Sequence, residues 1–204
     1  MGDDIEERSG DPPAANRLRS LATALDDAYP SGRLAGFSVA DGRLVGLLSA
    51  DPDPLRAVIV GGLIDGAPRV RWAVVEGRLE PGHGSVARRA AALLDGARGA
   101  IDLARSRRDH LIIRTGEAGA DRLLDGIAPL LVDLLDDLSD RQRTVARLLL
   151  VDGLRQADAA DTLAVSRATV SVMVGRGRIP SIERLADAIR AVMGAARLAL
   201  AESE

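Results

Sequence analysis

Helical and extended spacings of apolar residues alternate along the first 118 residues. Apolar side chains recur at helical spacing over residues 16–29, and Pro30 and Gly32 then predict a stop. Two short apolar runs are joined by Asp41-Gly42, a dipeptide typical of tight hairpin turns. The pattern therefore predicts helices over residues 16–29, 54–63 and 85–98 (the last extending as far as 107) and strands over 34–40, 44–50, 69–79 and 110–114.

This order of elements is helix, strand, strand, helix, strand, helix, strand, which is typical of an α+β sandwich with helices on one face of a sheet. A ferredoxin-like unit has one more strand in front of the first helix. Residues 1–13 are too polar for that strand and end in Pro12-Pro13. We expect a ferredoxin/cyclase-like domain over residues 1–118 whose first strand is missing, either because it was lost or because the native N-terminus lies upstream.

A longer apolar stripe at helical spacing occupies residues 121–138. Pro129 within it predicts a kink. Two interpretations remain open: a core helix packed on its own domain, or a connector or dimer helix over residues 119–138. The stripe consists of Leu123, Leu124, Ile127, Leu130, Leu131, Leu134, Leu135 and Leu138.

Residues 139–204 predict an all-α C-terminal domain that begins with three short helices. Ser139 is placed to cap the first, which runs to about Val151 and ends near Gly153. Two further helices follow, over 155–163 and from Arg167 onward, and they meet at a three-residue turn, the form of a DNA-reading helix-turn-helix.

Small side chains and caps support this interpretation. Ala160 stands where the two helices would cross, and a small residue permits close approach there. Ser166 is expected to cap the second helix by accepting from the amide of Thr169. A last amphipathic helix over residues 182–200 is expected to pack on this unit or on a second copy.

The outward positions of the second helix carry no acid, which suits phosphate oxygens and base edges of double-stranded DNA. We expect Arg167, Thr169 and Ser171 to contact bases or nearby phosphates. The phosphate backbone of the duplex is expected to be held by Arg155, Gln156, Arg176 and Arg178. We also count Ser166 among the DNA-binding residues, because it caps the second helix. The alternative is an ordinary helical hairpin whose arginines are solvated.

Composition narrows the possible functions. The chain has 204 residues, 47% of them hydrophobic, with no cysteine and two histidines, so thiolate sites are excluded and a metal centre is not expected. All 27 basic residues are arginine. Schiff-base and P-loop chemistry, which both need a lysine, are therefore excluded. The net charge is −3, yet residues 139–204 hold ten arginines against eight acidic residues. The less acidic part therefore coincides with the predicted DNA-binding domain.

No run of residues approaches the roughly 20 apolar positions that span a bilayer, and the N-terminal residues are acidic and polar, unlike a signal peptide. We expect a cytoplasmic chain without membrane contact. No G-x-S-x-G elbow or other catalytic constellation occurs in the sequence, so we expect neither an enzyme nor a cofactor.

One glycine-rich turn is a candidate ligand loop. Gly82, Gly84 and Ser85, with Arg88 beside them, have the composition of a phosphate-binding turn at a helix N-terminus. The sequence lacks the ending of a P-loop, and the alternative is a plain connection from strand to helix. Of the two histidines, His83 is expected to be solvated and His110 to be structural.

The order of these features resembles the SatD family of bacterial proteins. The elements that carry the resemblance are Gly2-Asp3-Asp4, residues 41–48, Arg71 to Gly77, residues 87–90, and Arg141-Gln142 with the helices behind it. Arg141-Gln142 also resembles the start of the promoter-reading domain of sigma factors. The family's front half resembles nucleotide cyclases, whose paired carboxylates hold magnesium. This chain has Gly42 and Arg43 where those acids stand, so the resemblance implies that the metal chemistry has been lost.

We therefore expect a sequence-specific DNA-binding transcriptional regulator that acts as a homodimer, since one recognition helix reads only a few base pairs. The N-terminal domain would serve sensing or assembly, with an unidentified small-molecule effector possible. Two alternatives remain: a nucleotide-binding or nucleotide-processing protein, and a protein-assembly module.

Overall fold

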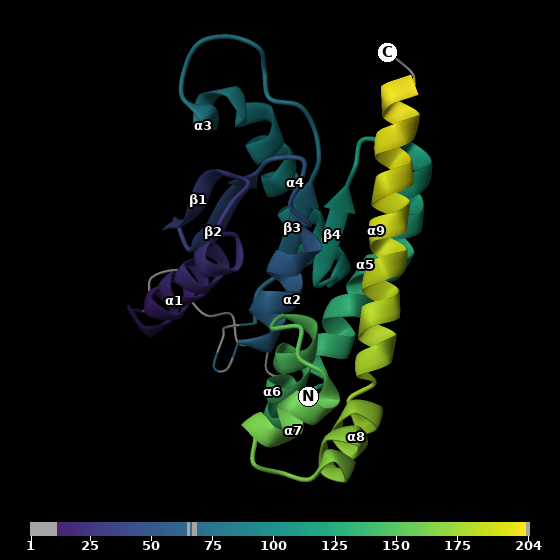
Figure 1. Ribbon diagram of the computed structural model, residues 1–204. Coiled ribbons are helices and arrows are strands. Elements are labelled where there is room, and N and C mark those ends of the chain that lie inside the picture. Colours follow the sequence, from purple (N-terminus) through teal and green to yellow (C-terminus); the bar gives the residue numbers. More distant parts are fainter. Residues whose placement is uncertain (1–11, 65, 67–68, 203–204) are drawn as a thin grey trace.

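The computed structural model describes residues 12–64, 66 and 69–202 (Figure 1). The described elements alternate between helices and short strands in the first part and are helical from residue 118 onward. The helices are α1 (Pro12–Ala28), α2 (Leu55–Leu63), α3 (Val86–Arg89), α4 (Ala91–Arg107), α5 (Ala118–Asp136), α6 (Asp140–Leu150), α7 (Gln156–Thr162), α8 (Arg167–Arg176) and α9 (Ile179–Glu202). The strands are β1 (Arg33–Ala40), β2 (Arg43–Leu48), β3 (Trp72–Val75) and β4 (Leu111–Arg114). The mixed class expected from the sequence is confirmed.

The β1–β2 hairpin is the local structure that the sequence predicts most directly. Asp41 and Gly42 adopt φ of 52° and 68°, the left-handed conformation that both central residues of a tight turn require. The two strands pair antiparallel from Ala40 and Arg43 outward. The hairpin packs on α1 through a cluster that includes Leu21, Leu25 and Tyr29.

The single sheet expected for an α+β sandwich is not found among the described strands. β1 and β2 form one sheet, whereas β3 and β4 form a separate parallel pair. A parallel pair needs a long crossover, which α3 and α4 supply. The hairpin instead covers α1, so the ferredoxin-like arrangement of these strands is replaced by two small sheets. The proposed missing first strand falls mostly on residues outside the described range.

Several element boundaries differ from those expected. β3 covers only Trp72–Val75 of the predicted 69–79, because only these residues pair with β4. The helix predicted from residue 85 is broken at Ala90, whose φ of −94° and ψ of 7° lie between α3 and α4. α1 starts before residue 16, and α9 starts at Ile179, before the expected residue 182.

The core of the molecule is organised around α5. Its residues Leu124, Ala128, Leu131 and Leu135 are completely buried against β4, α2 and α9. The same cluster continues through α6, α7, α8 and α9. Apolar residues from all three predicted segments, 1–118, 119–138 and 139–204, therefore share one core, and the division of the chain into domains stays a prediction. The packing supports the interpretation of α5 as a core helix.

Arginine side chains fasten the helices to one another. Arg143 of α6 donates to the carbonyl oxygens of Gly62, Asp136 and Leu138, at the carboxyl ends of α2 and α5. Arg190 of α9 donates to Asp53 Oδ2 at 2.9 and 2.7 Å, while Asp53 Oδ1 accepts from the Leu55 amide at the start of α2. No helix among the described residues is long and apolar enough to cross a membrane.

Asp26 joins α1 to the hairpin. Its Oδ1 accepts from the Phe37 amide at 2.9 Å and lies 2.5 Å from an Arg33 guanidinium nitrogen. The Phe37 hydrogen bond lowers the pKa of the Asp26 carboxyl, burial acts in the opposite direction, and Arg33 lowers the pKa further. The ionised carboxylate therefore stabilises the attachment of the hairpin.

We predict that Asp26→Ala lowers the free energy of unfolding in urea by about 1–2 kcal/mol near neutral pH. The neighbouring exposed Asp27→Ala is the matched control and should have little effect. Because the folded pKa of Asp26 is lowered, its contribution is present above the unfolded pKa of about 3.9 and disappears as pH falls through the folded pKa. The difference between wild type and Asp26→Ala should therefore shrink in acid, and equal stabilities of the two variants at pH 7 would contradict the assignment.

Candidate nucleic-acid interface

α7 and α8 pack closely at the lower end of the molecule in Figure 1. Ala159 and Ala160 of α7 are buried, and Ala160 belongs with Val170 of α8 to the core cluster that also holds Val145 of α6. Helices with such small residues at their crossing approach closely. The predicted role of Ala160 as a contact point is thus in accord with its burial, and three helices share one apolar centre.

The turn between α7 and α8 has the caps that the sequence predicts. Ala164 adopts a φ of 52°, which reverses the chain after α7. Ser166 Oγ then accepts from the Thr169 amide at 3.1 Å, and the two hydroxyl groups lie 2.8 Å apart. These contacts satisfy one of the free amides of the first turn of α8. The start of α8 is therefore fixed by its own sequence.

The outward face of α8 is fully available. Arg167, Thr169 and Ser171 are exposed, and so are the neighbouring Ala168 and Val172. No acidic residue occurs in α8, whereas its inward Val170 and Val174 are buried. A helix face with one guanidinium and several hydroxyl groups offers donors for phosphates and for base edges.

The arginines expected to contact DNA differ in their surroundings. Arg167 and Arg176 are exposed and form no ion pair within the described part of the chain. Arg155 is 88% exposed and lies 3.2 Å from Asp158. Arg178 pairs with Asp137 at 2.9 Å, so it would have to leave that carboxylate to reach a phosphate. Gln156, the first residue of α7, is exposed as expected.

The electrostatic balance of this surface is modest but positive. Residues 155–178 contain four arginines and two aspartates, Asp158 and Asp161, both on α7. The acids lie on the first helix, whereas the unpaired guanidinium groups of Arg167 and Arg176 lie on the second. Anions would therefore be attracted to α8 more than to α7.

Two residues of α6 have roles that sequence reasoning missed. Gln142 Oε1 accepts from the amide and hydroxyl of Ser139, so it is a helix-capping residue. Arg143 is the clamp that joins α6 to α2 and α5. The S-x-x-Q spacing signals the cap in the sequence. The role of Arg143 has no local signal, because its partners lie up to 81 positions away.

The predicted ligand loop is an exposed turn in front of a very short helix. Gly82 and Gly84 have φ of 132° and 145°, and Ser85 Oγ accepts from the Arg88 amide at 3.3 Å as an ordinary N-cap. α3 has only four residues, so few free amides converge there. His83 is exposed, as expected.

The second histidine is also accounted for by a side-chain contact. His110 precedes β4, and its Nδ1 lies 3.2 Å from Asp133 Oδ1 of α5, in a contact that is about half exposed. Within residues 12–64, 66 and 69–202, no group of three or more histidine, aspartate or glutamate side chains is arranged to hold a metal ion.

No protein-family model, curated protein or solved structure matches this chain. The surface around α8 is therefore interpreted from its own geometry and chemistry.

We predict that Ala160→Leu destabilises the protein by about 1–3 kcal/mol, because a larger side chain at the buried crossing of α7 and α8 must push the helices apart. Ala168→Leu adds the same atoms to the exposed face of α8 and should leave the midpoint of urea unfolding nearly unchanged. Unfolding is monitored by circular dichroism. Equal midpoints of urea unfolding for the two variants would show that the helices do not touch at Ala160.

Proposed function

We propose that this chain is a sequence-specific DNA-binding transcriptional regulator in which α7 and α8 act as a helix-turn-helix. The observation that carries the proposal is the exposed face of α8, which has no acid, begins at a Ser166 cap and presents the unpaired Arg167. In such units the N-terminal residues of the second helix meet base edges in the major groove. Arg176 follows on the same helix and would contact the phosphate backbone. The SatD resemblance stays a hypothesis beside this proposal.

We further propose that a second copy binds along α5. Leu123 and Leu130 are 60% and 50% exposed, and the half-buried Ile127 and Leu134 continue the same stripe. The spacing of four, three and four positions is that of a helix-pairing seam. An antiparallel copy would set Leu123 opposite Leu134 and Ile127 opposite Leu130, which makes the stripe self-complementary.

Charge favours the antiparallel direction. Arg122, near the start of α5, and Asp133, near its end, are both exposed and lie to the same side of the apolar stripe. In an antiparallel pair each arginine approaches the aspartate of the other copy, whereas a parallel pair would set like charges together. Two copies would bring two α8 helices to one duplex, as a two-fold site requires.

We predict that Arg167→Ala weakens binding to the preferred duplex by about 1–3 kcal/mol and relaxes the sequence preference at one position. Arg176→Ala should weaken binding to all duplexes by a similar factor. It should also reduce the slope of log affinity against log salt concentration by about 1. Arg88→Ala removes an exposed arginine of α3, at the opposite end of the molecule, and serves as the control (Figure 1).

The preferred duplex is first obtained by sequencing genomic fragments that the purified protein retains, and the affinities are then measured by fluorescence anisotropy across a salt series. If all three variants bind like the wild type, α8 is not the reading helix. If the wild-type protein retains no DNA at low salt, the proposed function is wrong.

We predict that Leu130→Glu converts a homodimer into a monomer in light scattering after gel filtration. The two substituted side chains would bring like charges into the centre of the apolar seam, which disfavours pairing. Leu34→Glu introduces the same change at an exposed hairpin residue and should leave the mass unchanged. A wild-type mass of one chain, with and without DNA, would contradict the α5 interface.

A further inference from the structure

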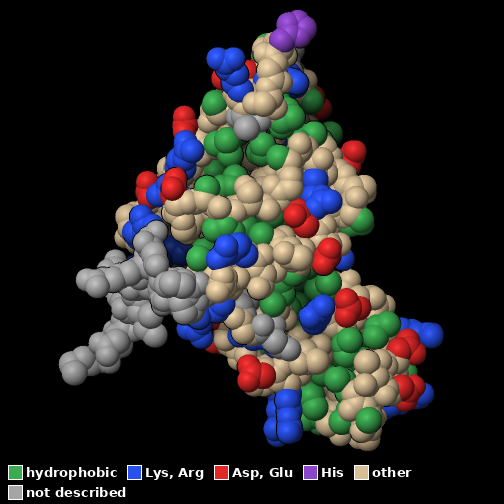
Figure 2. Space-filling view, turned by 90° about the vertical axis from the view of Figure 1, so that its left-hand side faces the viewer, with side chains coloured by type: hydrophobic (Ala, Val, Ile, Leu, Met, Phe, Trp, Pro, Cys, Tyr) green, Lys and Arg blue, Asp and Glu red, His purple; other side chains and the backbone are tan. Residues whose placement is uncertain are grey.

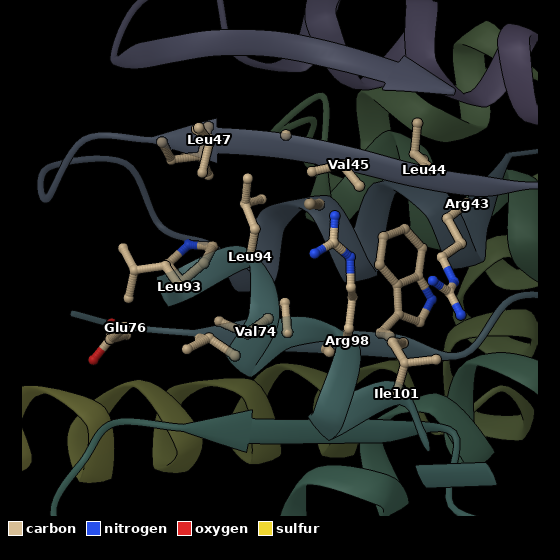
Figure 3. Close-up of a pocket in the computed structure, with 18 of the residues that line it drawn as sticks. Arg43, Leu44, Val45, Leu47, Val74, Glu76, Leu93, Leu94, Arg98 and Ile101 are labelled. Carbon is tan, nitrogen blue, oxygen red and sulfur yellow. The ribbon is translucent and has the colours of Figure 1, made fainter. Parts of the chain in front are cut away.

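A wide cleft separates the hairpin from the β3–β4 layer. Its volume is about 2550 Å³, and it is lined by β2 on one wall and by β3 and α4 on the other. Figure 3 shows β2 and β3 running along opposite walls, with side chains filling the space between them. The cleft lies away from α8, so its contents can be examined independently of DNA binding (Figure 1).

The walls carry aliphatic side chains that no core covers. Val45 and Leu47 of β2 face Leu93, Leu94 and Ile101 of α4 across the cleft, and all are partly exposed. None of these five belongs to the three clusters of buried and half-buried apolar residues in the described part of the chain. Apolar side chains left in water lower stability, and their burial by a ligand would be favourable.

The lining of the same cleft holds more arginine than acid although the whole chain is acidic, and Arg98 and Arg105 pair with aspartates just outside the lining. Its only acidic lining residues in the described structure are Asp41 and Glu76, and Glu76 already pairs with Arg197. Eight arginines line it, which are Arg43, Arg69, Arg71, Arg78, Arg98, Arg105, Arg108 and Arg197. A cleft with this excess of one charge concentrates counter-charged ligands.

Two of these arginines enter the cleft from opposite walls. In Figure 3, Arg43 extends into the cleft from β2 and Arg98 extends into it from α4. Arg43 forms no ion pair among the described residues. Arg98 pairs only with Asp95, one turn earlier on the exposed side of α4. Both guanidinium groups are therefore accessible to an anion between the walls.

The chemistry of the lining selects among anions. The chain has one Trp, one Tyr and one Phe. Phe37 and Trp72 line the cleft and the Trp72 ring also lies against Gly61 of α2, so the aromatic surface for stacking a nucleobase is limited to these two side chains. Leucine, isoleucine and valine dominate the apolar lining. On the side of α1 and the hairpin, Figure 2 shows hydrophobic side chains reaching the surface among basic and acidic ones.

From these observations we infer that the cleft binds an anion with an aliphatic body, of the class of straight-chain fatty acids. The hydrocarbon chain lies between the leucine and valine side chains of β2 and α4. The carboxylate lies between the guanidinium groups of Arg43 and Arg98, each of which supplies charge-assisted hydrogen bonds. Binding brings the two walls of the cleft into contact through the ligand.

The test measures the binding of sodium decanoate to the full chain. Binding is measured by calorimetry and by the fluorescence of Trp72, which lines the cleft. Decanoate should bind saturably at one site, and each CH₂ added from hexanoate to decanoate should tighten binding by up to about fourfold. Decanol and inorganic phosphate, which each lack half of the ligand, should bind at least about tenfold more weakly.

The double variant Arg43→Gln and Arg98→Gln should bind decanoate about tenfold or more weakly, since both charged donors are lost. Arg147→Gln combined with Arg184→Gln is the matched control, because both arginines are exposed outside the cleft. The chain-length series on the wild-type protein decides the matter if the double variant does not fold.

Four results would overturn the inference. The first is that decanoate does not bind at any concentration below micelle formation, and the second is that the affinity of the carboxylates does not depend on their chain length. Phosphate or adenosine monophosphate binding as tightly as decanoate would replace the aliphatic ligand by another anion. Equal decanoate affinities of the folded cleft variant and the control would place the ligand elsewhere on the protein.

Discussion

The need to cover the apolar face of α5 determines how the rest of the chain is arranged. Leu124, Leu131 and Leu135 can be buried only if β4, α2 and α9 surround the helix, and each of these does so. The helix is also fixed at both ends. Glu117 accepts from the Gly119 and Ala120 amides, which lower the pKa of its carboxyl, and Arg143 holds the carbonyl groups at the other end. The orientation of α6, and through it of α8, therefore follows from the position of α5.

Local features of this structure were predictable because each depends on neighbours in sequence. Asp41-Gly42 makes its hairpin turn, Ser166 caps α8, and the small Ala160 lies at a buried helix crossing. Features that depend on distant residues were not predictable from periodicity. The division of the strands into two sheets, the clamp formed by Arg143 and the pairing of Arg190 with Asp53 across 137 positions are of this kind. Tertiary packing leaves no repeating pattern in the sequence by which such partners are recognised.

The candidate DNA surface shows the same division. The exposure of Arg167, Thr169 and Ser171 follows from helical spacing alone. The ion pair of Arg178 with Asp137, 41 positions earlier, does not, although it changes what Arg178 is free to contact. Net charge was a poor guide in both halves of the molecule. A total of −3 conceals an acid-free α8 and a cleft in which arginine greatly outnumbers acid.

α9 connects the helix that carries the candidate DNA surface, α8, with the cleft. It begins directly after the joint with α8 and ends with Arg197 and Leu200 in the lining of the cleft. At about 1.5 Å per residue its 24 residues form a rod of about 36 Å. Helix shifts between functional states are often about 1–2 Å. Because α9 is one continuous helix that packs on α5, a shift of that size at one end of α9 would also move its other end. α9, packed along α5, thus extends as one continuous helix from the joint with α8 to the lining of the cleft.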